Sequence, residues 1–336
     1  MSAVGQPITG DFFNTLIQKS VAKVGVVVED PFKDIYLNIN SPSHTIKLPF
    51  SLPVGGLVAA GNTSGKGIFG KTPTANVNWN AFSVTRAPYS RPIPVERLIA
   101  TSDQTGVYAE LPKNIARAAQ AHVPSLTTDI FVGGLTGTTI SEIDNLPFFS
   151  NSHTLVGDTV IDNKLTDALS EYSYIKAAIR LNSFYVQPDA QSRPQLLNEG
   201  GKRILMVGPS QEFLAKKILK RENTPFQGNN VLYNDAEIRV NRFLTGSYAN
   251  YWFLFAVGGE SKAVLKWESE PIKVTFFSER NDRACAESFQ WEYIVSWVGA
   301  VHPLYFHTVI GSDGTTAYTA GTGAYVPAEV LPTKAV

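Results

Sequence analysis

One segment of the sequence matches a pattern that binds nucleotide phosphates. Residues 65–72, which read Gly-Lys-Gly-Ile-Phe-Gly-Lys-Thr, fit G-x-x-x-x-G-K-[ST] in full. The pattern binds phosphate when a buried strand leads into the loop and a helix follows at once, because backbone N–H groups and the helix N-terminus hold the anion. Here Pro73 follows directly, and residues 75–84 have the character of a strand. The context favours a Gly/Lys-rich loop, and a phosphate-loop nucleotide-binding enzyme stays a remote alternative.

The histidines and their neighbouring serines indicate neither a metal site nor a nucleophile. No two histidines have a metal-binding spacing together with a carboxylate. Ser150 and Ser152 stand close to His153, but adjacent residues on a turn rarely point together, and no G-x-S-x-G elbow is present. Cys285 is the single cysteine, which excludes an intrachain disulfide and a cysteine-rich zinc site. We therefore expect no enzymatic activity, cofactor or metal, and an uncharged His153 bonded to the backbone in a structural turn.

Four tryptophans in the last third could form a platform on which nucleic-acid bases stack. Such a platform also needs a cationic surface, and the chain has 29 Lys plus Arg against 29 Asp plus Glu, a net charge of zero. The sequence therefore favours packing in a core or an interface, and it argues against DNA binding as the main activity. The four are Trp252, Trp267, Trp291 and Trp297.

A run of mixed charge lies between the last strands. It extends from Glu268 to Glu287 and includes Arg280 and Arg283. Such a run is usually a solvated rim that contributes little to stability. In an assembling subunit, the same charges can pair with a neighbour and set the register of the contact. We expect Arg280 and Arg283 at a contact between subunits.

The first 94 residues predict an arm and a loop more than a packed lobe. Residues 11–28 form an amphipathic stretch that runs into an apolar strand, and the chain up to Pro94 is rich in Gly, Pro, Ser, Thr and Asn, with short runs typical of hairpins. Such a segment cannot readily bury its own apolar side chains, so neighbouring subunits are expected to cover them. The residues expected at subunit contacts are Phe12, Phe13, Leu16, Ile17, Trp79 and Phe82, and Ile46 and Leu48 also need partners.

The middle of the chain predicts three helices. The first starts near Pro112 and is bent or interrupted at Pro124. The second covers residues 166–186, and the third runs to Arg221 behind a cap at Ser210. The residues expected to face inward are Leu169, Tyr172, Ile175 and Ile179 in the second helix and Phe213, Leu214 and Ile218 in the third.

The last third predicts strands separated by turn residues, so the fold class is α+β. A chain of 336 residues with 43% hydrophobic residues is long enough for two lobes or one elaborated lobe. No run of about 18 apolar residues is present, and residues 1–11 lack a basic segment followed by an apolar one, so we expect neither a membrane span nor export. The expected strands are residues 238–244, 251–257, 263–267, 272–277 and 288–298.

The order of these motifs resembles that of the major head protein family of phage Mu and its prophage relatives. Residues 146–157 carry two phenylalanines, then His153 and a glycine, and a helical segment follows. Residues 203–210 then read as a buried strand that ends in a proline and opens the next helix. The similarity covers roughly residues 102–310. The sequence departs from the family pattern where Thr154 stands in place of the usual proline and where the acidic doublets are reduced to Asp103 and Glu110.

The resemblance implies a Hong Kong 97-like capsid fold and the function of a major capsid protein of a tailed double-stranded DNA phage or prophage. Implied partners are other copies of the chain, portal, scaffold or decoration proteins, and packaged DNA contacted non-specifically at the inner surface, with no membrane. The implied location is the virion capsid, assembled in the host cytoplasm. The implied parts are an N-terminal arm (1–48), an extended loop (49–97), a peripheral domain with a spine helix (98–144 and 269–336) and an axial domain (145–268).

Four alternatives stay open beside this interpretation. Within the same fold, the chain could form an encapsulin-like nanocompartment or the shell of a gene-transfer particle. Outside the fold, a carbohydrate-binding β-rich module and the phosphate-loop enzyme remain.

Overall fold

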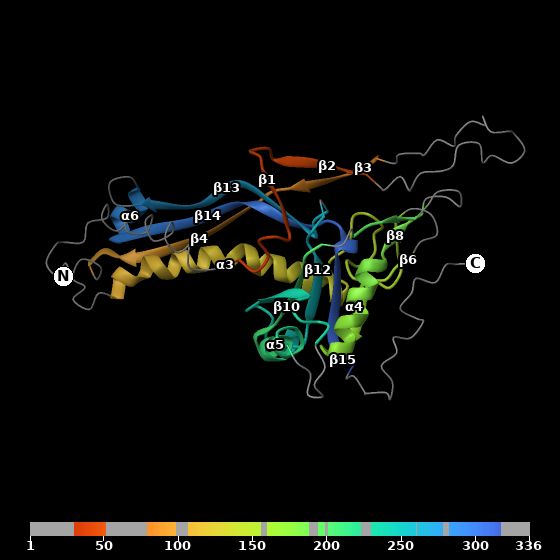
Figure 1. Ribbon diagram of the computed structural model, residues 1–336. Helices are drawn as coiled ribbons and strands as arrows, with labels where there is room; N and C mark the ends of the chain where they lie inside the picture. Colours follow the sequence, from red (N-terminus) through yellow and green to blue (C-terminus); the bar gives the residue numbers. More distant parts are fainter. Residues whose placement is uncertain are drawn as a thin grey trace, which may run out of the picture.

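The computed structural model describes residues 30–51, 79–98, 107–155, 160–187, 194–198, 201–222, 230–259, 261–277 and 282–316. Two sheets organise these residues, and Figure 1 shows them side by side in an elongated molecule. A long helix, α3, runs along the first sheet and reaches the second. The observed mixture of helices and strands confirms the predicted α+β class.

The first sheet has four strands in the order β1-β13-β14-β4. β13 and β14 pair antiparallel along nearly their whole length, so two strands predicted within residues 263–277 are one long strand with register shifts at Glu268 and Glu270. The edge strand β4 contains three prolines, which cannot donate ladder hydrogen bonds and therefore protect the open edge. The bounds are β1 Tyr36–Asn40, β4 Ala87–Glu96, β13 Val264–Phe277 and β14 Gln290–Pro303.

The long helix α3 spans Val107–Thr136, so it begins before Pro112 and continues through Pro124. The predicted interruption at Pro124 is therefore wrong, and the alternative of a bend there stays a prediction. A proline inside a helix removes one hydrogen bond and costs about 3 kcal/mol. Val123 and Pro124 are both buried, so packing of α3 against the rest of the chain offsets this cost.

The second sheet has five strands in the order β11-β10-β12-β15-β7. β10 and β12 are buried at almost every position, because α5 packs near β10 and β11 and α4 near β12 and β15. Residues 309–316, which the resemblance assigns to the peripheral domain, pair with this sheet, and the division into domains stays a prediction. The bounds are β7 Lys164–Asp167, β10 Arg203–Val207, β11 Ala236–Val240, β12 Trp252–Ala256 and β15 Val309–Thr316.

Helix α4, Glu171–Ser183, begins at a capping box. The Ser170 hydroxyl accepts from the Ser173 N–H, and the Ser173 side chain accepts from the Ser170 N–H. Its buried face consists of Ser173, Tyr174, Ala177 and Leu181. The predicted apolar stripe therefore lies on a neighbouring face of the helix and not on the buried one. The predicted residues Tyr172, Ile175 and Ile179 are half-buried beside it.

Helix α5 spans Glu212–Leu219 and follows the short 3-10 turn η1, Pro209–Gln211. Ser210 does not cap it, because the Ser210 hydroxyl donates to the Ala249 carbonyl at 3.0 Å. Ile218 is buried as predicted, but Phe213 is 80% exposed and Leu214 is also exposed. The inward prediction is therefore wrong for these two residues.

A hairpin-like pair stands beside the first sheet in Figure 1, formed by β2, Thr45–Ser51, and β3, Trp79–Thr85. Ile46, Leu48 and Phe82 pack against a cluster of Val84, Leu265, Trp267 and Leu304. The expectation that these three have no partner within the chain is therefore wrong. The remaining elements are β5 His153–Thr154, β6 Val160–Ile161, β8 Tyr185–Val186, β9 Gln195–Leu196, α6 Arg283–Ser288, η2 Gly246–Tyr248 and η3 Phe306–Thr308.

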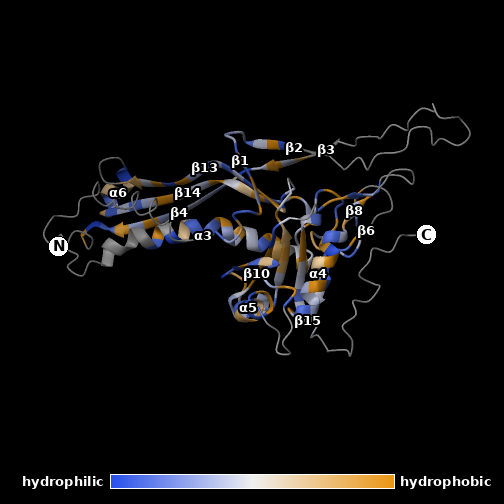
Figure 2. Ribbon diagram, viewed as in Figure 1, coloured by the Kyte–Doolittle hydropathy of each residue, from blue (hydrophilic) through white to orange (hydrophobic). Residues whose placement is uncertain are grey.

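One large hydrophobic cluster joins α3, the second sheet and α4. Figure 2 shows hydrophobic residues concentrated in the strands and helix of this part. The four tryptophans are buried, as predicted for packing residues. Trp252 Nε1 donates to the Asp167 carbonyl at 2.9 Å, and Trp267 Nε1 donates to the Ser41 carbonyl at 3.0 Å, so both indole N–H groups have acceptors.

Candidate subunit-contact surfaces

The Phe148-Phe149 segment lies where the first sheet meets the second. Both rings are buried and pack with Phe131 of α3 and Phe253 of β12. A Cβ at Gly311 would lie 2.7 Å from the Phe149 ring, so β15 can approach this closely only with glycine. The segment therefore fixes the end of α3 against the second sheet.

His153 connects three parts of this junction. Its Nδ1 lies 2.6 Å from Asp144 Oδ2, and its Nε2 lies 3.2 Å from the Phe148 carbonyl oxygen. The imidazole is fully buried and stacks on Phe306, the first residue of η3. The sequence indicated the backbone partner but missed the carboxylate of Asp144, which stands nine residues earlier in the chain. The contacts make His153 a packing and bonding residue of the junction.

Asn163 is a second buried polar residue at the same place, and the sequence analysis missed it. Its Oδ1 accepts from the Ser150 N–H at 2.9 Å, and its Nδ2 donates to the carbonyls of Phe148 and Phe306 at 2.9 and 3.1 Å. The Phe148 and Ser150 groups belong to irregular segments and Phe306 begins η3, so none of these backbone groups lies in a strand ladder. The available signal was an asparagine between the apolar positions Ile161 and Leu165, which is unusual in a buried strand.

The junction does not form a nucleophile and base. Both ring nitrogens of His153 already lie near Asp144 and the Phe148 carbonyl. The Ser150 and Ser152 hydroxyls lie 3.4 Å from each other. A general base must be within hydrogen-bond reach of the group it deprotonates, and His153 is directed elsewhere.

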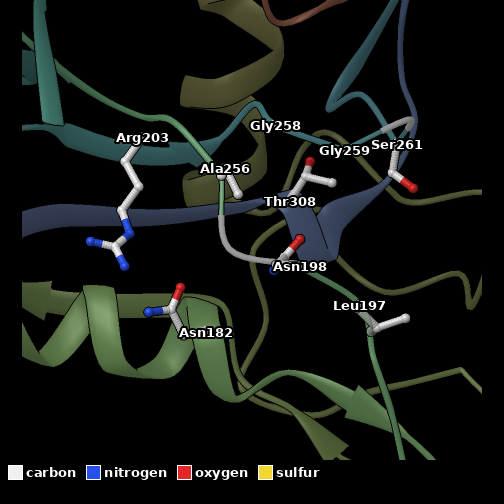
Figure 3. A pocket seen from close by; sticks show the side chains of 10 residues that line it. Asn182, Leu197, Asn198, Arg203, Ala256, Gly258, Gly259, Ser261 and Thr308 are labelled. Atoms are coloured by element: carbon white, nitrogen blue, oxygen red, sulfur yellow. The ribbon is translucent and has the colours of Figure 1, made fainter. Parts of the chain in front are cut away.

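A small polar cavity lies beside the start of β10, and Figure 3 shows its lining. Its volume of about 20 Å³ has room for about one water molecule. Arg203 on its wall pairs with Asp235 at 2.5 Å, and Asn198 donates to the Leu181 and His307 carbonyls at 2.8 Å. Its size and satisfied polar groups indicate a structural cavity and not a ligand site.

A charged cluster fixes the first described residues to the second sheet. Arg239 on β11 pairs with Asp34 and with Glu237, the latter at 2.8 Å, and donates to the Pro31 carbonyl at 3.1 Å. The hydrogen bond from Arg239 lowers the pKa of Asp34. Phe32 stacks on Phe131 with ring centroids 5.7 Å apart, so the first described residues pack against α3.

The residues predicted at subunit contacts fall in different places. Phe82 packs partly within its own chain, and Trp79 begins β3. Arg283 begins α6, is 92% exposed and pairs with Glu287 at 2.7 Å. The prediction that these residues contact neighbours stays a prediction. Phe12, Phe13, Leu16, Ile17 and Arg280 lie outside the described residues, as does the phosphate-loop match at residues 65–72.

Two further observations bear on the site. Within the described residues, no group of three or more His, Cys, Asp or Glu side chains could hold a metal ion. Among the helices of the same part of the chain, none is long and apolar enough to cross a membrane.

No protein-family model and no curated protein matches the chain. Among the solved structures that resemble the chain are two capsids. The chain of the capsid of Cyanophage P-SCSP1u is 10% identical, with a TM-score of 0.54 over 86% of this chain and 88% of that chain. The chain of the capsid of a native GTA particle is also 10% identical, with a TM-score of 0.54 over 84% and 89%. The chain therefore has the fold of these capsid subunits, the Hong Kong 97-like fold that the resemblance implied.

Proposed function

We propose that this chain is the major capsid protein of a tailed double-stranded DNA phage or prophage, and that its copies assemble into a closed icosahedral shell around the genome. The observation that carries this proposal is the fold, which is shared with two capsid subunits over more than four fifths of the chain. Such a function is structural and needs no catalytic residue. The occupied ring nitrogens of His153 agree with that role.

The shape of the subunit supports assembly through extended parts. The β2–β3 pair stands beside the first sheet, and residues 52–78 connect its two strands. Residues 1–29 precede the first described residue and carry an amphipathic stretch. Exchange of such arms and loops gives large interfaces between copies, and repeated interfaces can close a shell.

The finer assignments rest on the order of motifs. We propose membership of the Mu-like head protein family, an arm at residues 1–48, an extended loop at 49–97, and peripheral and axial parts built on the first and second sheets. Portal, scaffold or decoration proteins and the inner face of packaged DNA are the proposed partners. The proposed location is the virion capsid, assembled in the host cytoplasm.

A gene-transfer particle is a second candidate, because the GTA capsid matches with the same TM-score as the phage capsid. The DNA recovered from purified native particles distinguishes these two candidates. A phage shell holds one defined genome, whereas a gene-transfer particle holds mixed fragments of host DNA.

Deletion of residues 1–28 tests assembly by arm exchange. Full-length protein is expected to form hollow closed particles in negative-stain images. The deletion variant is expected to remain folded by circular dichroism and to form none. Normal shells from the deletion variant would contradict arm exchange, while particles from the full chain would still support the shell function.

A further inference from the structure

A groove separates α3 from strands β4 and β14, and it encloses about 320 Å³. That volume is at the lower end of the range for sites that bury a ligand. Apolar side chains dominate its lining, which includes Tyr89, Ile93, Ile115, Ala119, Val295 and Trp297. An open apolar groove of this size between a helix and a sheet is a favourable place for apolar side chains of another segment.

His122 places one polar group in this apolar wall. Its ring packs edge-on against Tyr89 with centroids 4.6 Å apart and against Trp297 at 5.6 Å. The buried Nε2 has no hydrogen-bond partner within the described residues. An unpaired buried nitrogen costs free energy, so a segment that brings a polar group beside its apolar side chains would recover that cost.

The N-terminal segment has the matching pattern. Phe12, Phe13, Leu16 and Ile17 recur at the spacing of one helix face, and the polar residues Asn14, Thr15 and Gln18 lie between and behind them. No charged residue occurs from residue 12 to residue 18. Amphipathic segments bind hydrophobic grooves through apolar anchors at this spacing.

The position of the first described residues favours the groove of another copy over the chain's own groove. Phe32 stacks on Phe131, whereas Ile115 lines the groove. Phe131 stands sixteen positions after Ile115, which is a net rotation of about 160° at roughly 100° per residue, so the chain enters on the opposite side of the helix from the groove. The thirteen residues from Ile17 to Asp30 can span up to about 45 Å, so the arm can extend well away from the helix at which it enters.

We propose that the groove between α3 and strands β4 and β14 receives Phe12, Phe13, Leu16 and Ile17 of a neighbouring copy. This inference rests on the proposed shell function, and it names the surface that the exchanged arm occupies. Each subunit then both donates an arm and accepts one, which is the two-surface arrangement that closed rings require.

Disulfide trapping between two variants tests the proposal. In a Cys285→Ser background, one variant carries Leu16→Cys and the other carries Ser296→Cys, because Ser296 lines the groove. Mixed particles formed under mild oxidation are expected to give a covalent dimer on a non-reducing gel, at least tenfold above either variant alone. The matched control replaces Ser296→Cys with Ser43→Cys, which is exposed and outside the groove, and is expected to give no such dimer.

Particles without a dimer, or with equal dimer for Ser43→Cys, would overturn the proposal and leave the shell function intact. A disulfide formed within a single chain that carries both Leu16→Cys and Ser296→Cys would also overturn it, since the arm would then occupy its own groove.

A groove-filling variant, Ala119→Phe, gives a second measurement. Its particle yield is expected to fall at least tenfold with an unchanged melting temperature, and an unchanged yield would contradict the proposal. A full chain that stays monomeric under all conditions would instead refute the shell function.

Discussion

His153 and Phe306 stack face to face, with ring centroids 3.9 Å apart and planes inclined by 11°. The stack joins the segment that follows α3 to the residues that lead into β15. Asp144 Oδ2 lies 2.6 Å from His153 Nδ1, and Asn163 donates to the carbonyls of Phe148 and Phe306 in the same junction. The relative position of the two sheets therefore depends on a small buried polar cluster as well as on the phenylalanines around it.

Removal of the Asp144 carboxylate is expected to destabilise the subunit strongly. Asp144→Ala leaves buried His153 without its closest polar partner, and breaking a buried pair costs about 3 kcal/mol or more. Denaturant unfolding of the subunit measures the change. Glu142→Gln is the control, because Glu142 is half exposed and lies 3.9 Å from His302, and it is expected to change stability by less than about 1 kcal/mol. Equal effects of the two substitutions would show that the His153 pair contributes nothing specific.

A methyl group at Gly311 is expected to disturb the junction. The added Cβ would meet the Phe149 ring at 2.7 Å, and overpacking of a core costs about 1 to 3 kcal/mol. Gly311→Ala should therefore lower the melting temperature of the subunit in calorimetry. Gly259→Ala is the matched control, since its Cβ would meet nothing closer than 3.9 Å. A Gly311→Ala variant as stable as Gly259→Ala would show that the ring shifts at no cost.

Acid is expected to destabilise the subunit through its buried histidines. Burial lowers the pKa of His307 to about 4, from 6.5. Above pH 6.5 this group contributes no pH dependence. Between pH 6.5 and about 4, the unfolded chain binds a proton that the folded chain excludes, so stability falls by up to about 1.4 kcal/mol per pH unit. Burial also lowers the pKa of His302, which adds to the same trend.

The measurement is the free energy of unfolding from pH 7 to pH 5, compared with His307→Phe. The variant should lose the part of the slope that comes from His307, whatever its stability at pH 7. An identical slope in both proteins would show that His307 does not titrate in this way.

Reversing the charge at Arg283 tests whether this residue contacts a neighbouring subunit or is only solvated surface. The Arg283–Glu287 pair is exposed, so Arg283→Glu should change subunit stability by no more than about 0.5 kcal/mol. If Arg283 also pairs with a neighbour, the yield of particles should fall much more than the melting temperature does. Lys217→Glu is the control, because Lys217 is an exposed residue of α5, which packs near the second sheet. Small and equal effects on assembly for the two variants would mean that Arg283 is solvated surface.

The sequence predicted the elements with long, regular patterns. The strands at residues 251–257 and 288–298 were predicted because apolar residues cluster there between turn residues. The burial of Trp252 and Trp297 was predicted because the chain lacks the net positive charge that a base-stacking surface needs. The phase of α4 was missed because two neighbouring stripes of that helix are both apolar, and only contact with β12 and β15 selects Tyr174, Ala177 and Leu181.

Contacts between distant residues were not readable from one sequence. Nothing near His153 indicates that Phe306 meets it, because the two residues are 153 positions apart in the chain. Asp144 is only nine residues away, but the segment between them is irregular and has no periodic pattern that predicts the contact. The outward position of Phe213 was also missed, since a helix of eight residues gives a weak periodic signal and an exposed phenylalanine breaks the usual pattern.

The mass of the purified full-length protein in solution tests the central claim most directly. Size-exclusion chromatography with light scattering, across several salt and protein concentrations, reports whether 36.6 kDa chains associate. The account predicts ring-shaped capsomers or closed particles, with masses that are large multiples of the chain. A monodisperse monomer under every condition would contradict it.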